Sequence, residues 1–380
     1  MFRASTPLSV ERVLVVAKTS RLQVLSESLG LTGIQLQQEL SRRGYPVERM
    51  RISHEQQKRA LIHMSTALRR TKIKYTMRRT RTLGSRSAMT SLINDKDLIV
   101  TAGGDGTMLA VAALVSGPDA PPILAVNTDP HLSAGTLCTT SLTFPAQPGS
   151  VLADPSCKRV PKADAAKRDF DNVLAKVVQG EYDLLRRTRI RTSITKADES
   201  SSVTDLPRLA LNEVFYHEVD ASRPSVHETV VDDRTPGHVQ RSSGCIVATG
   251  TGSTAWMQSA CALTYADASL VLARSGVHPD ESQLRQIVEE VNQRCVFPPV
   301  STQLEYLVRE PVTNGWHGWT DLRLTSDLRR GFASYNVKLR SLGWDAALTM
   351  DGLKSYAVPY GATVEMSPAA DSPLKCIRFY

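Results

Sequence analysis

The sequence has no apolar run long enough to cross a membrane. A transmembrane helix needs about 20 consecutive apolar residues, and no run in this chain of 380 residues approaches that length. Hydrophobic residues make up 41% and charged residues 22% of the chain, with a mean hydropathy of -0.20, as in ordinary globular proteins. We therefore expect a soluble protein without a membrane partner, divided into about two domains because of its length.

Metal-binding patterns are missing as well. The cysteines are widely separated and include no C-x-x-C pair, and the eight histidines form no cluster with the spacing of metal ligands. The six cysteines are Cys138, Cys157, Cys245, Cys261, Cys295 and Cys376. This pattern predicts neither a disulfide framework nor a zinc site. We therefore assign no metal-ligating residues and expect a reducing compartment.

Acidic residues are absent from residues 69–86, where eight cationic side chains gather. They are Arg69, Arg70, Lys72, Lys74, Arg78, Arg79, Arg81 and Arg86. The formal net charge of +8 and the isoelectric point of about 9.2 favour anionic partners. However, this stretch contains a single aromatic residue, Tyr75, that could stack on bases. We therefore interpret it as a solvated helix or loop face and do not predict nucleic-acid binding.

Strands and helices alternate in the first part of the chain. Its strands are continuously apolar and rich in β-branched residues, which is typical of parallel strands buried on both faces. The pattern therefore predicts an α/β domain over residues 1–142. The expected elements are strand 13–17, a helix around Leu36 and Leu40 ending near Gly44, strand 47–52, helix 54–70, strand 97–100, helix 108–115 and strand 123–126.

The apolar pattern changes to a period of two in the second part of the chain. Residues 143–167 are rich in Pro, Ala, Asp and Lys and are interpreted as a linker. A mostly β domain is predicted for 143–355, and the segment 356–380 could return to the first domain. The expected elements are helix 171–182, strands 187–195, 209–215, 226–231 and 244–249, a helix across Leu284 to Val291, and strands 303–308, 335–339, 346–350, 363–366 and 374–379.

The most informative stretch is Thr101-Ala102-Gly103-Gly104-Asp105-Gly106-Thr107-Met108. Three glycines in four positions allow a sharp turn whose N–H groups can contact an anion, and the next helix offers its N-terminal dipole to that anion. Ligands of open α/β sheets bind where such turns leave the carboxyl ends of the strands. The segment 127–130, which follows the next strand, is expected at the same edge.

Two further patterns lie in the β-rich part. Asn212 and Glu213 interrupt an otherwise apolar strand and place an amide beside a carboxylate. Residues 249–256, Thr-Gly-Thr-Gly-Ser-Thr-Ala-Trp, form a second glycine turn that opens a helix. A polar pair at a strand end and a lone G-x-G turn are weak evidence when each is taken alone. Met350-Asp351-Gly352 is interpreted as a hairpin turn.

Taken together, these motifs resemble the NAD kinase family, whose members use ATP to phosphorylate the adenosine ribose 2′-hydroxyl of NAD. Gly103 to Thr107 looks like the G-G-D-G-[TN] motif of that family, Asn212-Glu213 like its N-E pair, and Thr251 to Ala255 like its T-G-S-T-A block. The order and spacing of the motifs agree as well. The resemblance implies a Rossmann-like domain, a β-sandwich-like domain and an active site in the cleft between them.

The chain is similar in particular to the mitochondrial-type branch of that family. Two departures from the widespread bacterial pattern are evident: residues 127–137 replace the usual N-x-G-x-L-G-F, and Ser243 stands where an acidic residue is common. The segments that look like this branch are 15–19, 127–130, 210–215, 242–244, 309–311 and 344–346. The resemblance implies a mitochondrial location, although the leader before the first strand is short, with a cytoplasmic location as the alternative. It also implies a homodimer.

The resemblance implies roles for individual residues. An aspartate is ionised at neutral pH, so Asp105 could accept the ribose hydroxyl proton as a general base. Gly103, Gly104, Gly106 and Thr107 would bind the ATP phosphates, and Mg²⁺ would be held mainly by those phosphates. The residues expected to bind NAD are Asn212, Glu213, Arg241, Ser243, Thr254, Ala255 and Ser259.

Two alternatives remain open from the sequence. A lipid kinase of the diacylglycerol or sphingosine type shares the G-G-D-G-T turn, but it would not explain Asn212-Glu213 together with the second glycine turn. A non-enzymatic nucleotide-binding or nucleic-acid-binding protein would fit the positive charge. The presence of Asp105 favours an active kinase over an inactive one.

Overall fold

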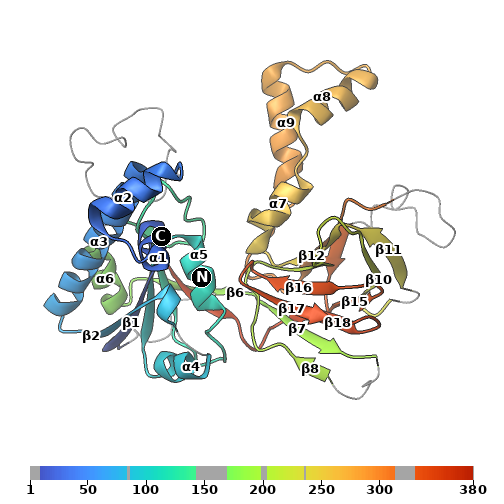
Figure 1. Cartoon of the computed structure of the whole chain (residues 1–380). Coiled ribbons are helices and arrows are strands. Elements are labelled where there is room, and N and C mark those ends of the chain that lie inside the picture. The colour runs from blue at the N-terminus through green and yellow to red at the C-terminus, as the bar shows by residue number, and fades with distance from the viewer. Residues whose placement is uncertain are drawn as a thin grey trace. The chain divides into compact units, whose positions relative to one another are not determined.

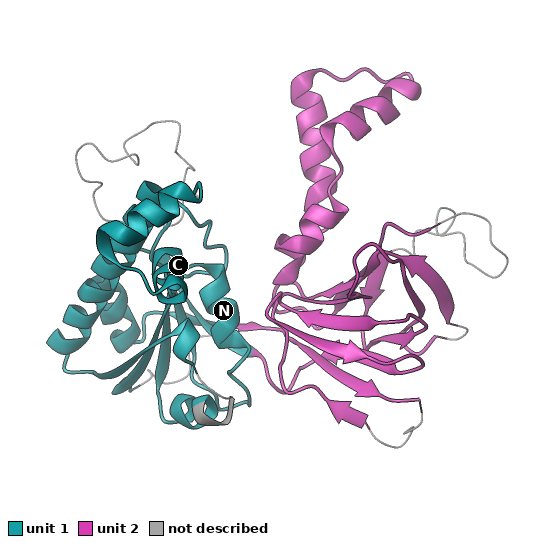
Figure 2. Cartoon of the chain, in the orientation of Figure 1, with its two compact units in different colours: residues 1–185, 374–380 teal, residues 186–373 magenta. Residues whose placement is uncertain are grey.

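The computed structural model describes residues 9–83, 86–142, 169–197, 203–234, 237–312 and 330–379. The chain divides into two compact units (Figure 2): unit 1 contains residues 1–185 and 374–380, and unit 2 contains residues 186–373. Unit 2 is therefore inserted into unit 1. Among the described residues, no helix combines the length and apolar character needed to span a bilayer.

Unit 1 is built on one sheet with the strand order β2-β1-β3-β4-β19-β6, and β5 pairs with β4. β1, β3 and β4 are mainly apolar, and all their residues except Arg12 are buried, as expected for the centre of a parallel sheet. The pairs β2–β1, β1–β3, β3–β4 and β4–β19 are all parallel. The strands are β1 (Arg12–Ala17), β2 (Lys74–Arg79), β3 (Leu98–Ala102), β4 (Ile123–Asn127), β5 (Thr140–Ser141), β6 (Asp183–Arg187) and β19 (Leu374–Arg378).

Two of the helices of unit 1 bury apolar side chains against this sheet, while Leu36 and Leu40 pack against Met50 in a separate cluster. Ala60 and Met64 of one helix and Phe170 and Val173 of another join the β1 residue Val15 in one apolar core, so these two helices cover the same face (Figure 1). The helices are α1 (Arg21–Leu29), α2 (Gly33–Arg42), α3 (Val47–Arg70), the short 3-10 helix η1 (Thr80–Thr82), α4 (Arg86–Asn94), α5 (Asp105–Ala112) and α6 (Phe170–Gln179).

The predicted strand at 47–52 is wrong. These residues begin α3, a single helix of 24 residues, in which Met50 packs with Leu36 and Leu40 and Ile52 is also buried. The strand beside β1 is instead β2, which lies inside the basic stretch. An edge strand with charged, exposed ends discourages pairing with another chain. Because of these charged residues, the sequence pattern did not indicate a strand here.

The boundaries between the two units differ from those expected from the sequence, 142/143 and 355/356. Helix α6 and most of β6 belong to unit 1, so the division falls between 185 and 186, because Phe170 and Val177 of α6 pack into the core of that unit. Only residues 374–380 return to unit 1. Their strand, β19, pairs with β4 at Cys376 and Ile123. The expected linker at 143–167 lies outside the described residues.

Unit 2 contains two antiparallel sheets that share one apolar core. Their orders are β11-β10-β15-β18-β7-β8 and β14-β13-β12-β9-β16-β17. Side chains from both sheets fill this core, among them Ile190, Tyr216, Val247, Leu339 and Leu348, as in a β-sandwich. The predicted mostly β fold is confirmed. The strands are β7 (Ile190–Thr195), β8 (Val203–Asp205), β9 (Glu213–Glu218), β10 (Ser225–Val231), β11 (His238–Ser242), β12 (Gly244–Ala248), β13 (Leu304–Arg309), β14 (Arg330–Ala333), β15 (Val337–Ser341), β16 (Ala346–Met350), β17 (Lys354–Val358) and β18 (Thr363–Pro368).

Three helices follow one another between β12 and β13 (Figure 1). After the short 3-10 helix η4 (Gly252–Thr254) come α7 (Trp256–Cys261), α8 (Tyr265–Arg274) and α9 (Glu281–Gln293). Asp280 caps α9 together with Gln283 in a capping box, and the helix predicted across Leu284 to Val291 lies within α9. Helix α8 was not anticipated.

Candidate functional site

The glycine turn of unit 1 connects β3 to α5 at the carboxyl edge of the parallel sheet, as predicted. The Gly103 N–H donates to the carbonyl of Val126 at 3.0 Å. A Cβ on Gly103 would lie 2.2 Å from Thr107 Oγ1, and one on Gly104 would lie 2.3 Å from Ser133 Oγ. These glycines are therefore needed for close approach. Thr107 is buried beneath the turn, whereas Gly106 is exposed with open space around it.

Asp105 is the first residue of α5, and its carboxylate is held by the segment that follows β4. Its Oδ2 accepts the backbone N–H of Thr136 at 3.0 Å and the Thr136 hydroxyl at 2.9 Å. Its Oδ1 accepts the backbone N–H of Leu137 at 2.8 Å. The position of this carboxylate is thus fixed by three hydrogen bonds to residues that the motif alone did not indicate.

The segment 127–130 lies at the same edge, as expected from the sequence. Asn127 organises it: its Nδ2 donates to the Ser133 carbonyl at 3.0 Å, and its Oδ1 accepts the Asp129 N–H at 3.0 Å. The buried Asp129 carboxylate pairs with Lys18 Nζ at 3.1 Å and accepts a hydrogen bond from the Ser53 hydroxyl. Among the described residues, the carboxylates at this edge therefore already have protein partners.

The Asn212-Glu213 pair lies at the start of β9 in unit 2, since the strand begins at Glu213 and not at residue 209. Here the predicted strand was too long at its start. The pair is adjacent to the second glycine turn, because the Thr249 N–H donates to the Asn212 carbonyl at 2.9 Å. A Cβ on Gly252 would lie 2.1 Å from that same carbonyl oxygen. The structure thus brings these two motifs together within one unit.

Both residues of this pair are buried, and each has one side-chain oxygen without a partner in the described structure. Asn212 is 7% exposed and Glu213 is 9% exposed. Asn212 Oδ1 and Glu213 Oε2 have no hydrogen-bond partner among the described residues. Burial, together with the nearby carboxylate of Asp351, raises the pKa of Glu213 to about 7. Buried polar atoms in folded proteins are nearly always hydrogen-bonded, so this amide and carboxyl are suited to receive a polar ligand.

The other expected NAD-binding residues follow the second glycine turn. Thr254 ends η4, Ala255 precedes α7, and Ser259 lies on α7. Ser259 lines a cavity of about 290 Å³ together with Trp256, Ala260, Leu307, Arg309 and Glu310. The Arg309 guanidinium lies 5.2 Å from the centre of the Trp256 ring, and Ser243 Oγ donates to Glu310 Oε2 at 2.6 Å. Ser243 is thus linked to this cavity through Glu310.

Arg241 lies elsewhere. It is exposed on β11 and lines a different, mostly apolar cavity of about 510 Å³. The other residues of this cavity are Glu218, Arg223, Pro224, Val226 and Trp344. In the described structure, Arg241 and Ser259 therefore line separate cavities.

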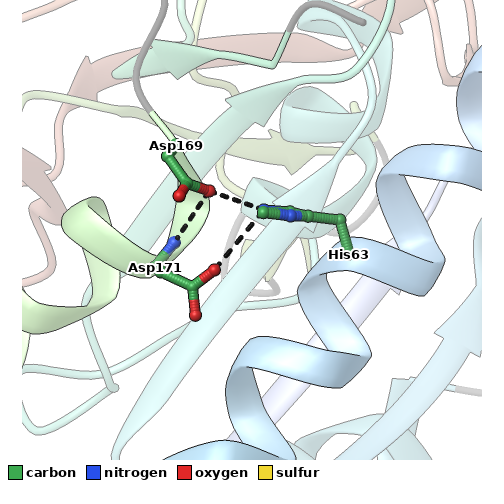
Figure 3. Close-up of side chains that lie close together, drawn as sticks. All are labelled: His63, Asp169 and Asp171. Carbon is green, nitrogen blue, oxygen red and sulfur yellow. Dashed lines mark hydrogen bonds and ion pairs between the residues drawn. The ribbon is translucent and has the colours of Figure 1, made fainter.

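One group of potential metal ligands was not indicated by sequence spacing (Figure 3). His63 of α3 faces Asp169 and Asp171 at the start of α6, with Nε2 lying 2.6 Å from Asp169 Oδ1 and 3.6 Å from Asp171 Oδ2. The Arg70 guanidinium already pairs with Asp171 at 3.0 Å, and Asp169 caps α6. These contacts join α6 to α3 without a metal ion.

The side-chain contacts of Asp351 could not be predicted from the sequence. The expected hairpin is present, since the β16–β17 pair closes at Met350 and Lys354. However, the Asp351 side chain points back to residues 211–213. No local pattern could have indicated this contact, because the partners are separated by about 140 residues in sequence.

Comparison with known proteins identifies similar sequences and folds. Residues 13–134 match the family described as the ATP-NAD kinase N-terminal domain. The protein named "NAD kinase 2, mitochondrial" of Rattus norvegicus is 27% identical, over 96% of this chain and 87% of the rat protein.

Two solved structures share the fold. Yeast NADH kinase, solved in complex with NADH, is 15% identical with a TM-score of 0.54, covering 98% of this chain and 84% of that chain. An NAD kinase from Archaeoglobus fulgidus, solved in complex with ATP, is 17% identical with a TM-score of 0.51, covering 97% and 93%. The predicted fold class, an α/β domain followed by a β-sandwich-like domain, is confirmed.

Proposed function

We propose that this chain, a member of the NAD kinase family, is an ATP-dependent enzyme that phosphorylates the adenosine ribose 2′-hydroxyl of NAD to give NADP. The resemblance predicted from the motifs is confirmed by the sequence match across nearly the whole chain. The observation that carries the proposal is the buried, unpartnered Asn212-Glu213 pair beside the second glycine turn, in a chain that also has Asp105 at the first one.

The NAD site is assigned to unit 2. Asn212 Oδ1 can accept a hydrogen bond, and the Glu213 carboxylate can accept two, so the pair suits neighbouring ribose hydroxyls. Binding would supply the donors that the buried oxygens lack. Thr254, Ala255 and Ser259 are proposed to surround the adenosine, with Ser259 facing the cavity beside Trp256. Arg241 and Ser243 remain proposed NAD contacts.

The ATP site is assigned to the glycine turn of unit 1. Gly103, Gly104 and Gly106 are proposed to let the triphosphate approach the backbone, and the N-terminus of α5 favours negative charge there. Thr107 contributes by supporting the turn from below. Because the carboxylates of Asp105 and Asp129 already have protein partners, Mg²⁺ is proposed to be held mainly by ATP. When bound, the ion neutralises phosphate charge that develops during transfer.

Asp105 is proposed as the general base. Its carboxylate takes the proton of the ribose 2′-hydroxyl while that oxygen bonds to the γ-phosphorus of ATP. The bond between the γ-phosphorus and the oxygen that bridges it to the β-phosphorus breaks, and ADP leaves with that electron pair. The reaction yields NADP, ADP and one proton. The three hydrogen bonds from Thr136 and Leu137 keep the carboxylate in one orientation.

The test is whether the purified protein, given ATP and Mg²⁺, converts NAD to NADP or NADH to NADPH. Asp105→Asn should bind NAD nearly as tightly as the natural protein but should lose turnover. Asp95→Asn, which changes an exposed aspartate of the same unit, should remain active. The proposal is overturned if no NADP forms while a lipid is phosphorylated or RNA is bound. Full activity of Asp105→Asn would reject the base assignment alone.

The proposal also includes the location of the protein in the cell and its oligomeric state. We propose a mitochondrial location, because the rat relative carries that name, and a homodimer, which the family resemblance implies. Fractionation of cells that express the tagged protein tests the first, and light scattering of the purified protein tests the second.

A further inference from the structure

Asp351 occupies a backbone conformation that costs energy. It follows β16 in the turn to β17, with φ 50°, and Gly352 follows with φ 65°. The left-handed region disfavours residues with a Cβ, although Asp and Asn tolerate it better than most. The side chain is 7% exposed. A buried carboxylate in a disfavoured conformation persists only if strong contacts compensate for both costs.

Those contacts all go to residues 211–213. Asp351 Oδ2 accepts the Leu211 N–H at 2.8 Å. Its Oδ1 accepts the N–H groups of Asn212 at 2.7 Å and Glu213 at 3.2 Å. In the reverse direction, the Asp351 N–H donates to the Glu213 carbonyl at 3.0 Å. Four hydrogen bonds thus join one turn residue to three consecutive residues at the start of β9.

Thr249 satisfies the remaining backbone groups of this segment. Its hydroxyl donates to the Leu211 carbonyl at 2.6 Å, and its N–H donates to the Asn212 carbonyl at 2.9 Å. Every N–H and carbonyl of residues 211–213 therefore has a partner from Asp351 or Thr249. The polar atoms left over are on side chains: Asn212 Oδ1 and Glu213 Oε2 have no partner among the described residues.

We propose that Asp351 is a positioning residue of the dinucleotide site, which fixes the backbone of residues 211–213 so that Asn212 and Glu213 point their free oxygens at the ribose. This inference rests on the proposed function. Asp351 itself does not touch the substrate. Its contribution is to remove the freedom of the segment before NAD arrives, since a preorganised site loses less entropy on binding.

The negative charge of Asp351 also affects the ionisation of Glu213. Its carboxylate is one of two causes that raise the pKa of Glu213, the larger being burial. Burial also raises the pKa of Asp351, while the three N–H donors and the cation Arg189 oppose that change. An asparagine in this place would keep the shape but would offer one acceptor atom where the segment needs two.

The experiment compares Asp351→Asn with a matched control, Asp232→Asn. Asp232 lies in the same unit, has φ 50° and also accepts three backbone N–H bonds, from Ser334, Tyr335 and Asn336 at 3.0, 2.7 and 3.2 Å. Both changes replace one acceptor oxygen of backbone N–H bonds and should lower stability, Asp351→Asn by more because Asp351 is buried and Asp232 is half-buried. Only Asp351→Asn should raise the KM for NAD, by about 30-fold, with kcat and the KM for ATP changed by less than about threefold. NAD affinity measured by calorimetry should fall in parallel.

A second variant keeps the test informative if Asp351→Asn does not fold. Thr249→Val removes the hydroxyl's bond to the Leu211 carbonyl and the bond that this hydroxyl accepts from the Gly252 N–H. It should weaken NAD binding in the same selective way. If either folded variant keeps the natural KM and affinity for NAD, Asp351 has only a structural role. An equal loss of NAD affinity in Asp232→Asn would lead to the same conclusion. If the natural protein makes no NADP, it is the proposed function that fails, so the two failures are distinguishable.

Discussion

The hydroxyl of Thr136 lies 2.9 Å from Oδ2 of Asp105, an oxygen that also accepts the backbone N–H of the same threonine. One residue therefore fixes the proposed base through both its main chain and its side chain. A carboxylate that must meet a substrate hydroxyl at hydrogen-bond distance benefits from this restraint.

Thr136→Val should lower kcat while leaving both KM values nearly unchanged. Valine has the same shape but no hydroxyl, so one of three hydrogen bonds to the carboxylate is lost, and a bond to a charged group is typically worth about a tenfold effect or more. Steady-state kinetics measures the change. Thr139→Val is the control, because that hydroxyl donates to the Ile377 carbonyl and not to Asp105. An unchanged kcat in Thr136→Val would mean that the backbone donors alone hold the carboxylate.

Gly106→Ala should separate phosphate binding from folding. A Cβ at this exposed position meets nothing within 4 Å, so stability should stay within about 0.5 kcal/mol of the natural protein. The added methyl group would obstruct a phosphate at the helix N-terminus, and the KM for ATP should rise about tenfold. Gly103→Ala, whose Cβ would lie 2.2 Å from Thr107 Oγ1, should instead lose about 1–3 kcal/mol of stability. Equal KM values for ATP in Gly106→Ala and the natural protein would place the triphosphate elsewhere.

Glu213→Gln should stabilise the protein at high pH. Burial and Asp351 raise the pKa of Glu213 from 4.5 to about 7 in the folded state. The folded protein therefore binds this proton more tightly than the unfolded chain, so the contribution of Glu213 to stability is fully present below pH 4.5 and is lost as the pH rises through 7. Above that range the ionised group costs up to about 3 kcal/mol, which the neutral amide avoids.

Urea unfolding at pH 4.5, 6 and 8 measures this difference. The gain in Glu213→Gln over the natural protein should grow with pH, while NAD binding should weaken. Glu228→Gln, which changes a partly exposed carboxylate paired with Arg340, should alter stability by less than about 0.5 kcal/mol at each pH. A gain that does not depend on pH would show that the ionisation of Glu213 is not its cause.

Where the physics is local, the sequence predicts the structure well. The apolar strands around Val15, Val100 and Val126 could be recognised because all their residues except Arg12 are buried, which requires continuous apolar runs. Helix α9 could be predicted because its apolar residues recur at helical spacing, and its capping residues Asp280 and Gln283 are only three positions apart. Strand β2 could not, because its Lys and Arg side chains suit an edge strand and a solvated loop equally well.

The candidate site shows the same limit. Asp105 and Asn212-Glu213 are visible as motifs because their chemistry is carried by adjacent residues. The residues that hydrogen-bond to them could not be predicted from the sequence, because they are far away along the chain. Thr136 is 31 positions from Asp105, and Asp351 is 138 positions from Glu213. Asp351 was interpreted from the sequence as a turn residue, which is correct for its backbone but leaves out its side chain. The partners of a side chain across a fold are set by tertiary packing, which periodicity and propensity do not contain.

The position of β19 between β4 and β6 determines the order in which the protein can assemble during synthesis. The ribosome releases β19 only after all of residues 186–373, so unit 2 can complete both of its sheets while unit 1 still lacks an interior strand. Until that strand arrives, the only described strand beside β4 on that side is the two-residue β5, and β6 has no neighbour in the described part of the sheet. Unit 1, although it begins first, is therefore the unit that finishes last.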